Sequence, residues 1–299
     1  MKKIPFHIIS GFLGSGKTTF LKHIIDQYSS EKKIGIIQNE FAPANIDGAV
    51  LKQSGKDFNL LEINNGSVFC VCLLGDFVKS LDKFVDEYQP DDIIIEASGL
   101  SDTTSISEII AASSLADKIY LASNWCIVDA PNFAKVGFMK QRVSHQLRMA
   151  DIVVINKTDL VDTGIAEVRD EIKKINPFAE IRETTFCNID FELGNSPISK
   201  FYFSEVEAMK EPKINSMVLK SARKTSCQSL EIFLNEWGPK SYRIKGFVNL
   251  TNGKIAAVQC TFETIEIIEM ENTFRPTEII AISDQFTMRE WNKSFKELV

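Results

Sequence analysis

The stretch Gly11-Phe12-Leu13-Gly14-Ser15-Gly16-Lys17-Thr18 decides the fold of this chain. It fits the pattern G-x-x-x-x-G-K-[ST], follows the apolar run IPFHIIS and opens a helix-like run that ends at Tyr28. In such a loop the backbone N–H groups wrap an anion, and the helix N-terminus adds partial positive charge. The lysine reaches the outer phosphates and the threonine hydroxyl ligates Mg²⁺. The stretch predicts a nucleoside triphosphate site formed by Gly11, Gly14, Ser15, Gly16, Lys17, Thr18 and Thr19.

A second motif, Asn156-Lys157-Thr158-Asp159, predicts which base is bound. It follows the apolar run DIVVI, so it lies where a strand ends. A carboxylate at Asp159 accepts from both N1–H and the N2 amine of guanine, whereas adenine offers no such pair of donors. The stem of Lys157 can lie along the base, and Asn156 can tie this loop to the phosphate loop. The sequence therefore predicts GTP and GDP as ligands, bound in part by Asn156, Lys157 and Asp159.

An acidic residue ends another apolar run, Ile93-Ile94-Ile95-Glu96, and is followed by Ala97-Ser98-Gly99. This placement suits a carboxylate that holds Mg²⁺ or positions water, and a backbone segment at Gly99 that senses the γ-phosphate. Lys17 and Glu96 are therefore candidate catalytic residues, and Thr18 and Glu96 are candidate Mg²⁺ ligands. An ordinary solvated carboxylate at the strand end is the alternative for Glu96.

Alternation of apolar runs with helix-length stretches defines the organisation of residues 4–185. The near-continuous apolar runs suit parallel strands buried on both faces, so we expect an α/β P-loop domain with a doubly wound, mostly parallel sheet over residues 1–189. One helix is expected from Pro131 to Met149. Residues 190–213 collect Gly, Pro, Ser and acidic residues and are expected to connect domains. Residues 214–299 then predict a smaller α+β domain built from hairpins and helices.

Composition excludes several classes of partner. Hydrophobic residues make up 44% of the 299 residues and charged residues 25%, as in soluble globular proteins. A net charge of −6 offers no basic footprint, so we expect neither nucleic acid nor a membrane as a partner. No run approaches the roughly twenty apolar residues of a membrane span, and a cytoplasmic location is expected. Four of the six cysteines are expected to fill cores: Cys126, Cys187, Cys227 and Cys260.

Together these motifs resemble those of the CobW-like P-loop GTPases, which are relatives of the urease- and hydrogenase-maturation GTPases. The resemblance rests on GFLGSGKTT, Asn39-Glu40-Phe41, Asn65-Gly66 before a cysteine cluster, Glu96 to Leu100, the Val128-Asp129-Ala130 strand end, Asn156 to Leu160, and Lys245-Gly246-Phe247. It covers nearly the whole chain. It implies GTP hydrolysis coupled to delivery of a transition metal, or to the servicing of a metal-dependent or corrinoid-dependent client. A homodimer is a further expectation.

The cysteine cluster departs from the usual family motif. The family has C-x-C-C after Asn-Gly, whereas this chain has Ser67-Val68-Phe69-Cys70-Val71-Cys72. Two thiolates suit Zn²⁺, Co²⁺ or Ni²⁺, and Glu40 or a client supplies the remaining ligand. Glu40 is accordingly a candidate both as a metal ligand and as a catalytic residue. A redox or packing role for the thiols, and a solvated Glu40, are the alternatives; His145 is expected at the surface rather than at a metal.

Three functions are compatible with the sequence. The first is a GTP-hydrolysing metallochaperone or metal-cofactor assembly factor whose C-terminal domain helps to bind the client. The second is a GTPase switch that activates a corrinoid- or metal-dependent enzyme and carries no metal itself. The third is a small-molecule or nucleotide kinase, against which the N-K-T-D motif and the lack of an Arg-rich lid argue. We expect slow hydrolysis by the isolated protein, because no arginine finger or glutamine is recognisable beside Glu96.

Overall fold

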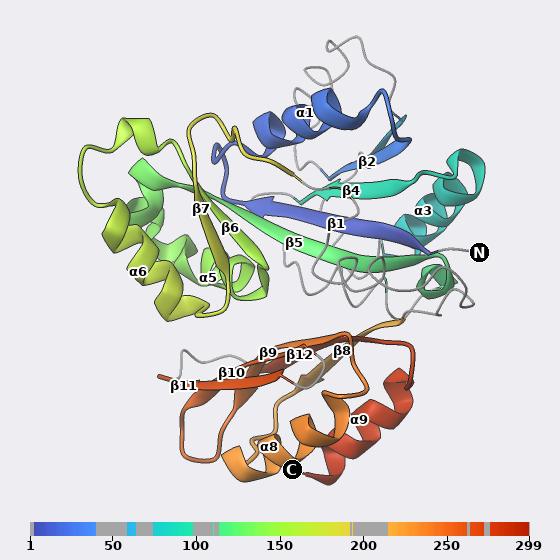
Figure 1. The fold of residues 1–299 in the computed structure, drawn as a ribbon, viewed down its shortest axis with the longest axis vertical. Coiled ribbons are helices and arrows are strands. Elements are labelled where there is room, and N and C mark those ends of the chain that lie inside the picture. Colours follow the sequence, from blue (N-terminus) through green and yellow to red (C-terminus); the bar gives the residue numbers. More distant parts are fainter. Residues whose placement is uncertain are drawn as a thin grey trace. The chain divides into compact units, whose positions relative to one another are not determined.

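The phosphate-loop stretch follows β1 (Ile4–Gly11), the middle strand of a seven-stranded sheet (Figure 1). The computed structural model describes residues 3–39, 59–63, 74–97, 110, 114–191, 193, 215–261, 264–271 and 276–298. Across the sheet, the strands lie in the order β3 (Asn59–Ile63), β2 (Ile34–Asn39), β4 (Asp92–Glu96), β1, β5 (Ile119–Asp129), β6 (Ile152–Asn156) and β7 (Glu180–Glu183). The pairs β1–β4, β2–β3, β2–β4, β5–β6 and β6–β7 are all parallel.

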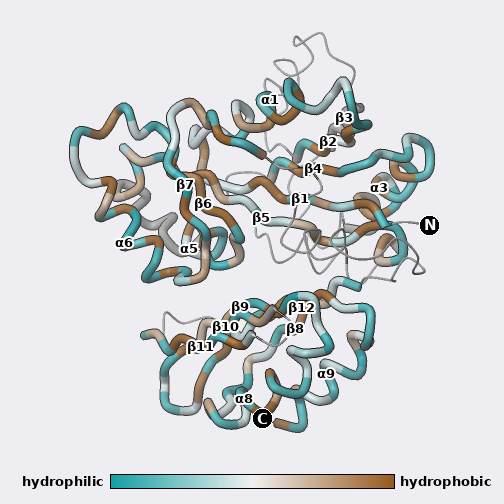
Figure 2. Tube along the Cα trace, in the orientation of Figure 1, coloured by the Kyte–Doolittle hydropathy of each residue, from teal (hydrophilic) through white to brown (hydrophobic). Residues whose placement is uncertain are grey.

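Both faces of this sheet are covered by helices, which confirms the doubly wound prediction. Alternate residues of β5 enter different cores: Trp125 and Ile127 join the cluster around helix α1 (Lys17–Tyr28), whereas Cys126 and Val128 join the cluster of the other face. Successive side chains of a strand point to opposite faces, so the two clusters lie on opposite sides. The second cluster contains residues of α5 (Lys140–Met149) and α6 (Ile165–Ile175). Figure 2 shows hydrophobic residues along the inner strands and hydrophilic stretches on α6.

The described residues before β7 also form helix α3 (Leu74–Tyr88) and the 3₁₀ segments η1 (Ser114–Asp117), η2 (Ala130–Met139) and η3 (Thr158–Leu160). The single helix predicted from Pro131 to Met149 is therefore wrong, because a 3₁₀ segment precedes α5. Gly137 lies within that segment, and glycine favours an α-helix less than other residues do, proline apart. The expectation of a surface His145 is also wrong, since its side chain is 7% exposed.

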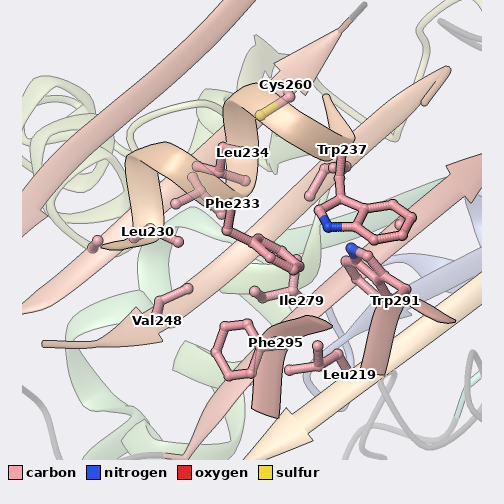
Figure 3. Close-up of a cluster of buried hydrophobic side chains, with 14 of the residues drawn as sticks. Leu219, Leu230, Phe233, Leu234, Trp237, Val248, Cys260, Ile279, Trp291 and Phe295 are labelled. Carbon is pink, nitrogen blue, oxygen red and sulfur yellow. The ribbon is translucent and has the colours of Figure 1, made fainter. Parts of the chain in front are cut away.

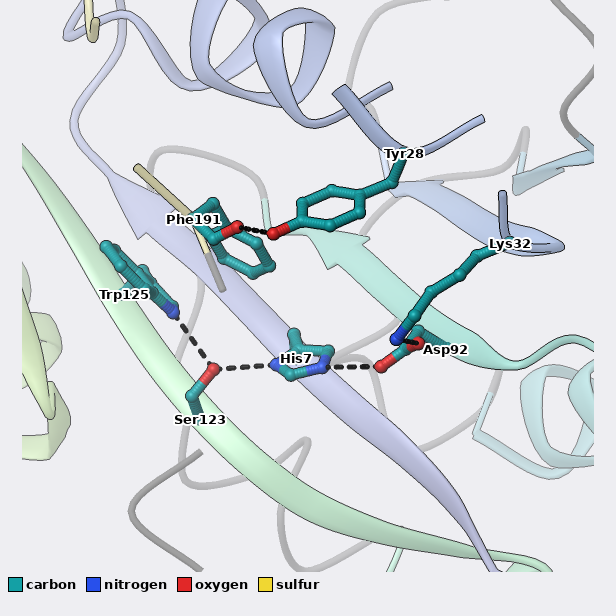
Figure 4. A network of polar contacts seen from close by, with 7 residues as sticks. All are labelled: His7, Tyr28, Lys32, Asp92, Ser123, Trp125 and Phe191. Atoms are coloured by element: carbon teal, nitrogen blue, oxygen red, sulfur yellow. Dashed lines mark hydrogen bonds and ion pairs between the residues drawn. The ribbon is translucent and has the colours of Figure 1, made fainter. Parts of the chain in front are cut away.

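A buried network of polar side chains crosses the sheet next to Phe191 (Figure 4). His7 Nδ1 lies 2.7 Å from Ser123 Oγ, and His7 Nε2 lies 3.2 Å from Asp92 Oδ1. Lys32 Nζ contacts the other oxygen of Asp92 at 2.9 Å, and the indole of Trp125 donates to Ser123 Oγ. The order Ser–His–Asp is that of a hydrolase triad. His7, Ser123 and Asp92 are all less than 5% exposed. This hydrogen-bonded network therefore joins strands of the sheet and is not accessible to a substrate.

Five antiparallel strands form a second sheet, in the order β11 (Thr264–Met270), β10 (Ile255–Thr261), β9 (Arg243–Asn249), β12 (Thr277–Ser283) and β8 (Asn215–Ser221). Helices α8 (Cys227–Trp237) and α9 (Met288–Glu297) pack on it. Their shared core is aromatic, with Phe233 stacked on Trp291 at 6.0 Å between ring centroids (Figure 3). The predicted α+β C-terminal domain is confirmed in class.

Contacts between Cα atoms divide the chain into two compact units. One comprises Ile4–Ile106 with Leu121–Phe201, and the other comprises Met1–Lys3, Ser107–Tyr120 and Tyr202–Val299. The second unit thus takes a segment from within the first 189 residues, as well as the C-terminal sheet. The boundaries predicted at residues 189 and 213 stay predictions.

Candidate nucleotide site

The phosphate loop leads into α1, and no side chain caps the N-terminus of that helix. Gly16 is the N-cap residue with φ of 110°, no side chain caps the helix, and its first turn holds no acidic residue. A Cβ on Gly16 would lie 2.5 Å from Asn156 Nδ2 and 2.9 Å from Cys187 Sγ. Only glycine therefore fits both the left-handed backbone and the close approach of these two side chains. The N–H groups at the N-terminus of a helix suit an anion such as a phosphate.

Lys17 and Ser15 place further polar atoms in the loop. Lys17 is 8% exposed, and its Nζ donates to Phe12 O at 3.2 Å, so the ammonium is held within the loop. The hydroxyl of Ser15 is buried and has no hydrogen-bond partner among the residues that the structure describes. Gly14, with φ of 74°, and the exposed Thr19 lie in or next to the same turn. These are the residues that the sequence predicts for phosphate binding.

Thr18 and Glu96, the two predicted Mg²⁺ ligands, are brought together. Thr18 Oγ1 donates to Glu96 Oε1 at 3.0 Å, and the buried Gln38 donates through Nε2 to Glu96 Oε2, also at 3.0 Å. Neighbouring ligands of an octahedral Mg²⁺ with bonds of 2.0–2.1 Å lie about 2.9 Å apart, which matches the Thr18–Glu96 separation. Both candidate ligand atoms are oxygens, the atom type that Mg²⁺ binds. The pair fits the ion, and Gln38 orients the carboxylate, a role that the sequence analysis missed.

The guanine motif is tied to the phosphate loop through one side chain. Asn156 is 2% exposed, and its Nδ2 donates to Ser15 O at 2.8 Å. Lys157 adopts a left-handed backbone with φ of 63°, and its Nζ lies 2.7 Å from Asp129 Oδ2 at the end of β5. Asp159 lies in η3 and is exposed, so its carboxylate is accessible to a base. The predicted tie by Asn156 is present in the structure.

A third loop, from Thr184 to Cys187, joins the site and was not predicted from the sequence. Cys187 N donates to Asn156 Oδ1 at 2.8 Å, and Cys187 Sγ donates to Gly16 O at 3.3 Å. Thr158 Oγ1 donates to Thr184 O at 3.1 Å. Burial raises the pKa of the Cys187 thiol to about 12, so it stays protonated and donates near neutral pH. The polar Thr-Thr pair at the end of a strand is the sequence feature that would have found this loop.

The match to known sequences agrees with this geometry. Residues 5–183 match the nucleotide-binding domain of CobW, HypB and UreG. The chain belongs to the CobW/HypB/UreG family. It is 33% identical over 198 residues to the zinc chaperone CobW of a Sinorhizobium species, covering 57% of this chain and 55% of that protein. It is 34% identical over 154 residues to the zinc chaperone YeiR of Escherichia coli K12, covering 51% and 46%. The chain thus spans about half the length of the curated relatives it matches.

Solved structures share the fold over the whole length of the chain. The Zn(II)-bound YjiA GTPase from E. coli superposes with a TM-score of 0.51 at 20% identity, and the match covers 100% of both chains. At this identity the likeness concerns the fold alone. The match of residues 5–183 confirms the predicted family, and this structure confirms the predicted fold.

Four predicted site residues lie outside the described residues: Glu40, Cys70, Cys72 and Gly99. Within the described ranges, no group of three or more His, Cys, Asp or Glu side chains is arranged to hold a metal ion. No described helix is long and apolar enough to cross a membrane. The core placement of thiols is confirmed for Cys126, Cys187 and Cys260, whereas Cys227 is only partly buried.

Proposed function

We propose that this chain binds Mg²⁺·GTP and hydrolyses it slowly. The observation that carries the proposal is the bonding of Asn156 to Ser15 O and Cys187 N, because it joins the phosphate loop and the guanine motif into one site. Asp159 selects guanine, Lys17 neutralises the outer phosphates, and the N–H groups of α1 bind them. The match of residues 5–183 to the nucleotide-binding domain of CobW, HypB and UreG supports nucleotide binding at this site.

Thr18 and Glu96 would hold the magnesium ion of this site. When bound there, the ion would supply positive charge that offsets the negative charge developing on the phosphates during hydrolysis. The residues contribute separately: the Thr18 hydroxyl and the Glu96 carboxylate supply oxygens, and Gln38 fixes the carboxylate through its amide. Unassisted P-loop GTPases turn over at roughly 10⁻⁴ to 10⁻² per second, and we expect this chain to lie in that range.

The second part of the proposal is that GTP turnover serves transfer of a transition metal to a client. Zinc chaperones among the relatives support this role, with Zn²⁺, Co²⁺ or Ni²⁺ as the cargo and not as a resident cofactor. Cys70, Cys72 and Glu40 are the proposed cargo ligands, with a client metalloprotein or corrinoid protein completing the shell. We also propose that the chain acts in the cytoplasm, as a monomer or a homodimer. Its GTPase domain would span residues 1–189 and its client-binding domain residues 214–299, with a connection at 190–213.

In a second candidate function, the chain hydrolyses GTP but carries no metal cargo. The chain has Cys70-Val71-Cys72 in place of C-x-C-C, which leaves two thiols where its family has three. With fewer thiolate ligands, the chain would act as a nucleotide-dependent activator of a metal-dependent or corrinoid-dependent enzyme.

A competition titration separates the two candidates. Zn²⁺ and Co²⁺ are titrated against a chromophoric chelator with the chain free, bound to GDP and bound to non-hydrolysable GTP, and again with Cys70→Ser/Cys72→Ser. Metal transfer predicts affinities that differ about 5–150-fold between nucleotide states, and loss of binding in the double variant. Equal affinities in all states, or an unchanged double variant, would exclude coupled metal transfer and favour the activator.

A further inference from the structure

Phe186 lies in the loop from Thr184 to Cys187 of the candidate nucleotide site, and its side chain is largely exposed to solvent. Its side chain is 71% exposed, the highest value among the large exposed hydrophobic residues of the described chain. Leu13 of the phosphate loop and Leu160 of η3 are exposed to a similar extent, at 62% and 65%. A single exposed apolar side chain is ordinary on a protein surface. The backbone conformation of Phe186 distinguishes it from these other exposed residues.

Phe186 and Cys187 occupy the left-handed region in succession. Their φ angles are 53° and 54°, a conformation that a bulky L-residue rarely adopts. Three contacts impose it: Asn156 Oδ1 accepts from Cys187 N, Gly16 O accepts from Cys187 Sγ, and His23 Nε2 lies 3.0 Å from Phe186 O. Backbone strain persists only where surrounding contacts over-determine it, and such residues cluster at ligand clamps.

The same loop is bonded to the segment that carries the guanine motif. Thr158 bonds to Thr184 O through both its amide, at 3.2 Å, and its hydroxyl, at 3.1 Å. Its hydroxyl also lies 3.2 Å from Thr185 Oγ1. Phe186 is the next residue along the chain, so its exposed side chain belongs to the loop that is bonded to the segment containing Lys157 and Asp159.

We propose that Phe186 is a base-binding residue whose ring stacks on the guanine of the bound nucleotide. This rests on the proposed binding of GTP. Aromatic rings stack on any base because every base has a π face, so Phe186 contributes affinity while Asp159 contributes selectivity. The division of roles gives the two residues different responses to changes in the ligand.

Isothermal titration of GDP and of inorganic tripolyphosphate tests the proposal. Stacking of a base on an aromatic side chain corresponds to about 5–150-fold in affinity, so Phe186→Ala should weaken GDP by that factor. Tripolyphosphate has no base, so its affinity should not change. Phe186→Leu, which keeps apolar area without a ring, should remain weak, whereas Phe186→Tyr should restore GDP binding. Leu160→Ala is the matched control, since it removes another exposed apolar side chain from the same edge.

A tryptophan at this position gives an optical readout. The three native tryptophans, Trp125, Trp237 and Trp291, are at most 7% exposed, so acrylamide quenches chiefly the new indole of Phe186→Trp. GDP should shield that indole from acrylamide, and tripolyphosphate should not.

The outcomes are distinct. GDP affinity of Phe186→Ala within twofold of the native protein, or an equal loss for tripolyphosphate, would overturn the stacking role. A native protein that binds neither GDP nor GTP would instead overturn the proposed function.

Discussion

At the scale of single residues, Asn156 holds three segments together with one amide. Its Nδ2 satisfies Ser15 O and its Oδ1 satisfies Cys187 N, and the contact leaves room for no side chain at Gly16. The sequence predicted the tie to the phosphate loop, because N-K-x-D follows a strand in a chain that also has a P-loop. It could not predict the tie to Cys187, since that contact depends on two left-handed residues that are not glycine.

Asn156→Ala should lower the free energy of unfolding by about 2 kcal/mol or more, because it strands two buried backbone groups without partners. Urea denaturation followed by circular dichroism measures the change. Asn188→Ala is the matched control, as it lies one residue after Cys187 with an exposed side chain, and should change stability by less than about 0.5 kcal/mol. Equal effects of both variants would show that Asn156 does not join the loops.

The buried thiols give stability a dependence on alkaline pH. Burial raises the pKa of Cys126 and of Cys260 from the ordinary 9.0 to about 12. The folded state therefore keeps protons that the unfolded state releases above pH 9, so stability is full below that pH and falls as pH rises toward 12. Each thiol contributes a slope of about 1.4 kcal/mol per pH unit in that window.

Cys260→Ala isolates one such thiol. Its free energy of unfolding, compared with that of the native protein by urea denaturation between pH 8 and 11, should differ by a constant amount below pH 9. Above pH 9 the native protein should lose stability faster than the variant. A constant difference across the whole range would show that Cys260 titrates normally.

At the scale of elements, the strands were predictable and one helix was not. The apolar runs of β4 (DIIIE) and β6 (IVVIN) are buried throughout, because parallel strands covered on both faces favour near-continuous apolar residues. The stretch from Pro131 to Met149 has helix-like composition along its length. Whether it winds as 3₁₀ or α turns depends on packing, and His145, Gln146 and Arg148 are buried in spite of their polarity.

Residues 184–191 form the element that sequence reasoning overlooked. They begin at the nucleotide loop and end at Phe191, which lies beside His7 and Trp125 in Figure 4. The Phe191 ring centroid is 4.8 Å from that of Trp125 and 5.5 Å from that of Phe20. The Tyr28 hydroxyl donates to Phe191 O. This segment therefore links the nucleotide edge to the core on the α1 face.

Phe191→Ala should destabilise the chain by about 3–5 kcal/mol, because a buried phenyl ring is replaced by a cavity. Phe186→Ala offers a close control: the same substitution five residues earlier removes an exposed ring and should cost less than about 0.5 kcal/mol. Thermal unfolding monitored by near-ultraviolet circular dichroism compares the two. Similar melting temperatures for both variants would contradict the anchoring role of Phe191.

At the scale of the whole molecule, two kinds of sheet in one chain follow from two kinds of sequence pattern. Strands separated by helix-length stretches give the parallel sheet, and strands separated by short turns such as Thr251-Asn252-Gly253 give the antiparallel one. The assignment of Ser107–Tyr120 to the second unit was not predictable, because it reflects contacts between segments far apart in sequence. The residues of the candidate nucleotide site were predictable, since the phosphates and the base fix the spacing of the motifs that bind them.

We propose that one site binds a guanine nucleotide through Asp159 and the phosphate loop. The most direct measurement is the affinity of the native chain, Asp159→Asn and Lys17→Ala for GTP, xanthosine triphosphate and ATP, by calorimetry with Mg²⁺ present. We expect the native chain to prefer GTP, Asp159→Asn to prefer xanthosine triphosphate because the amide complements its base, and Lys17→Ala to bind all three weakly. Equal binding of GTP and ATP by the native chain, or equal losses for every nucleotide in Asp159→Asn, would show that Asp159 does not select guanine.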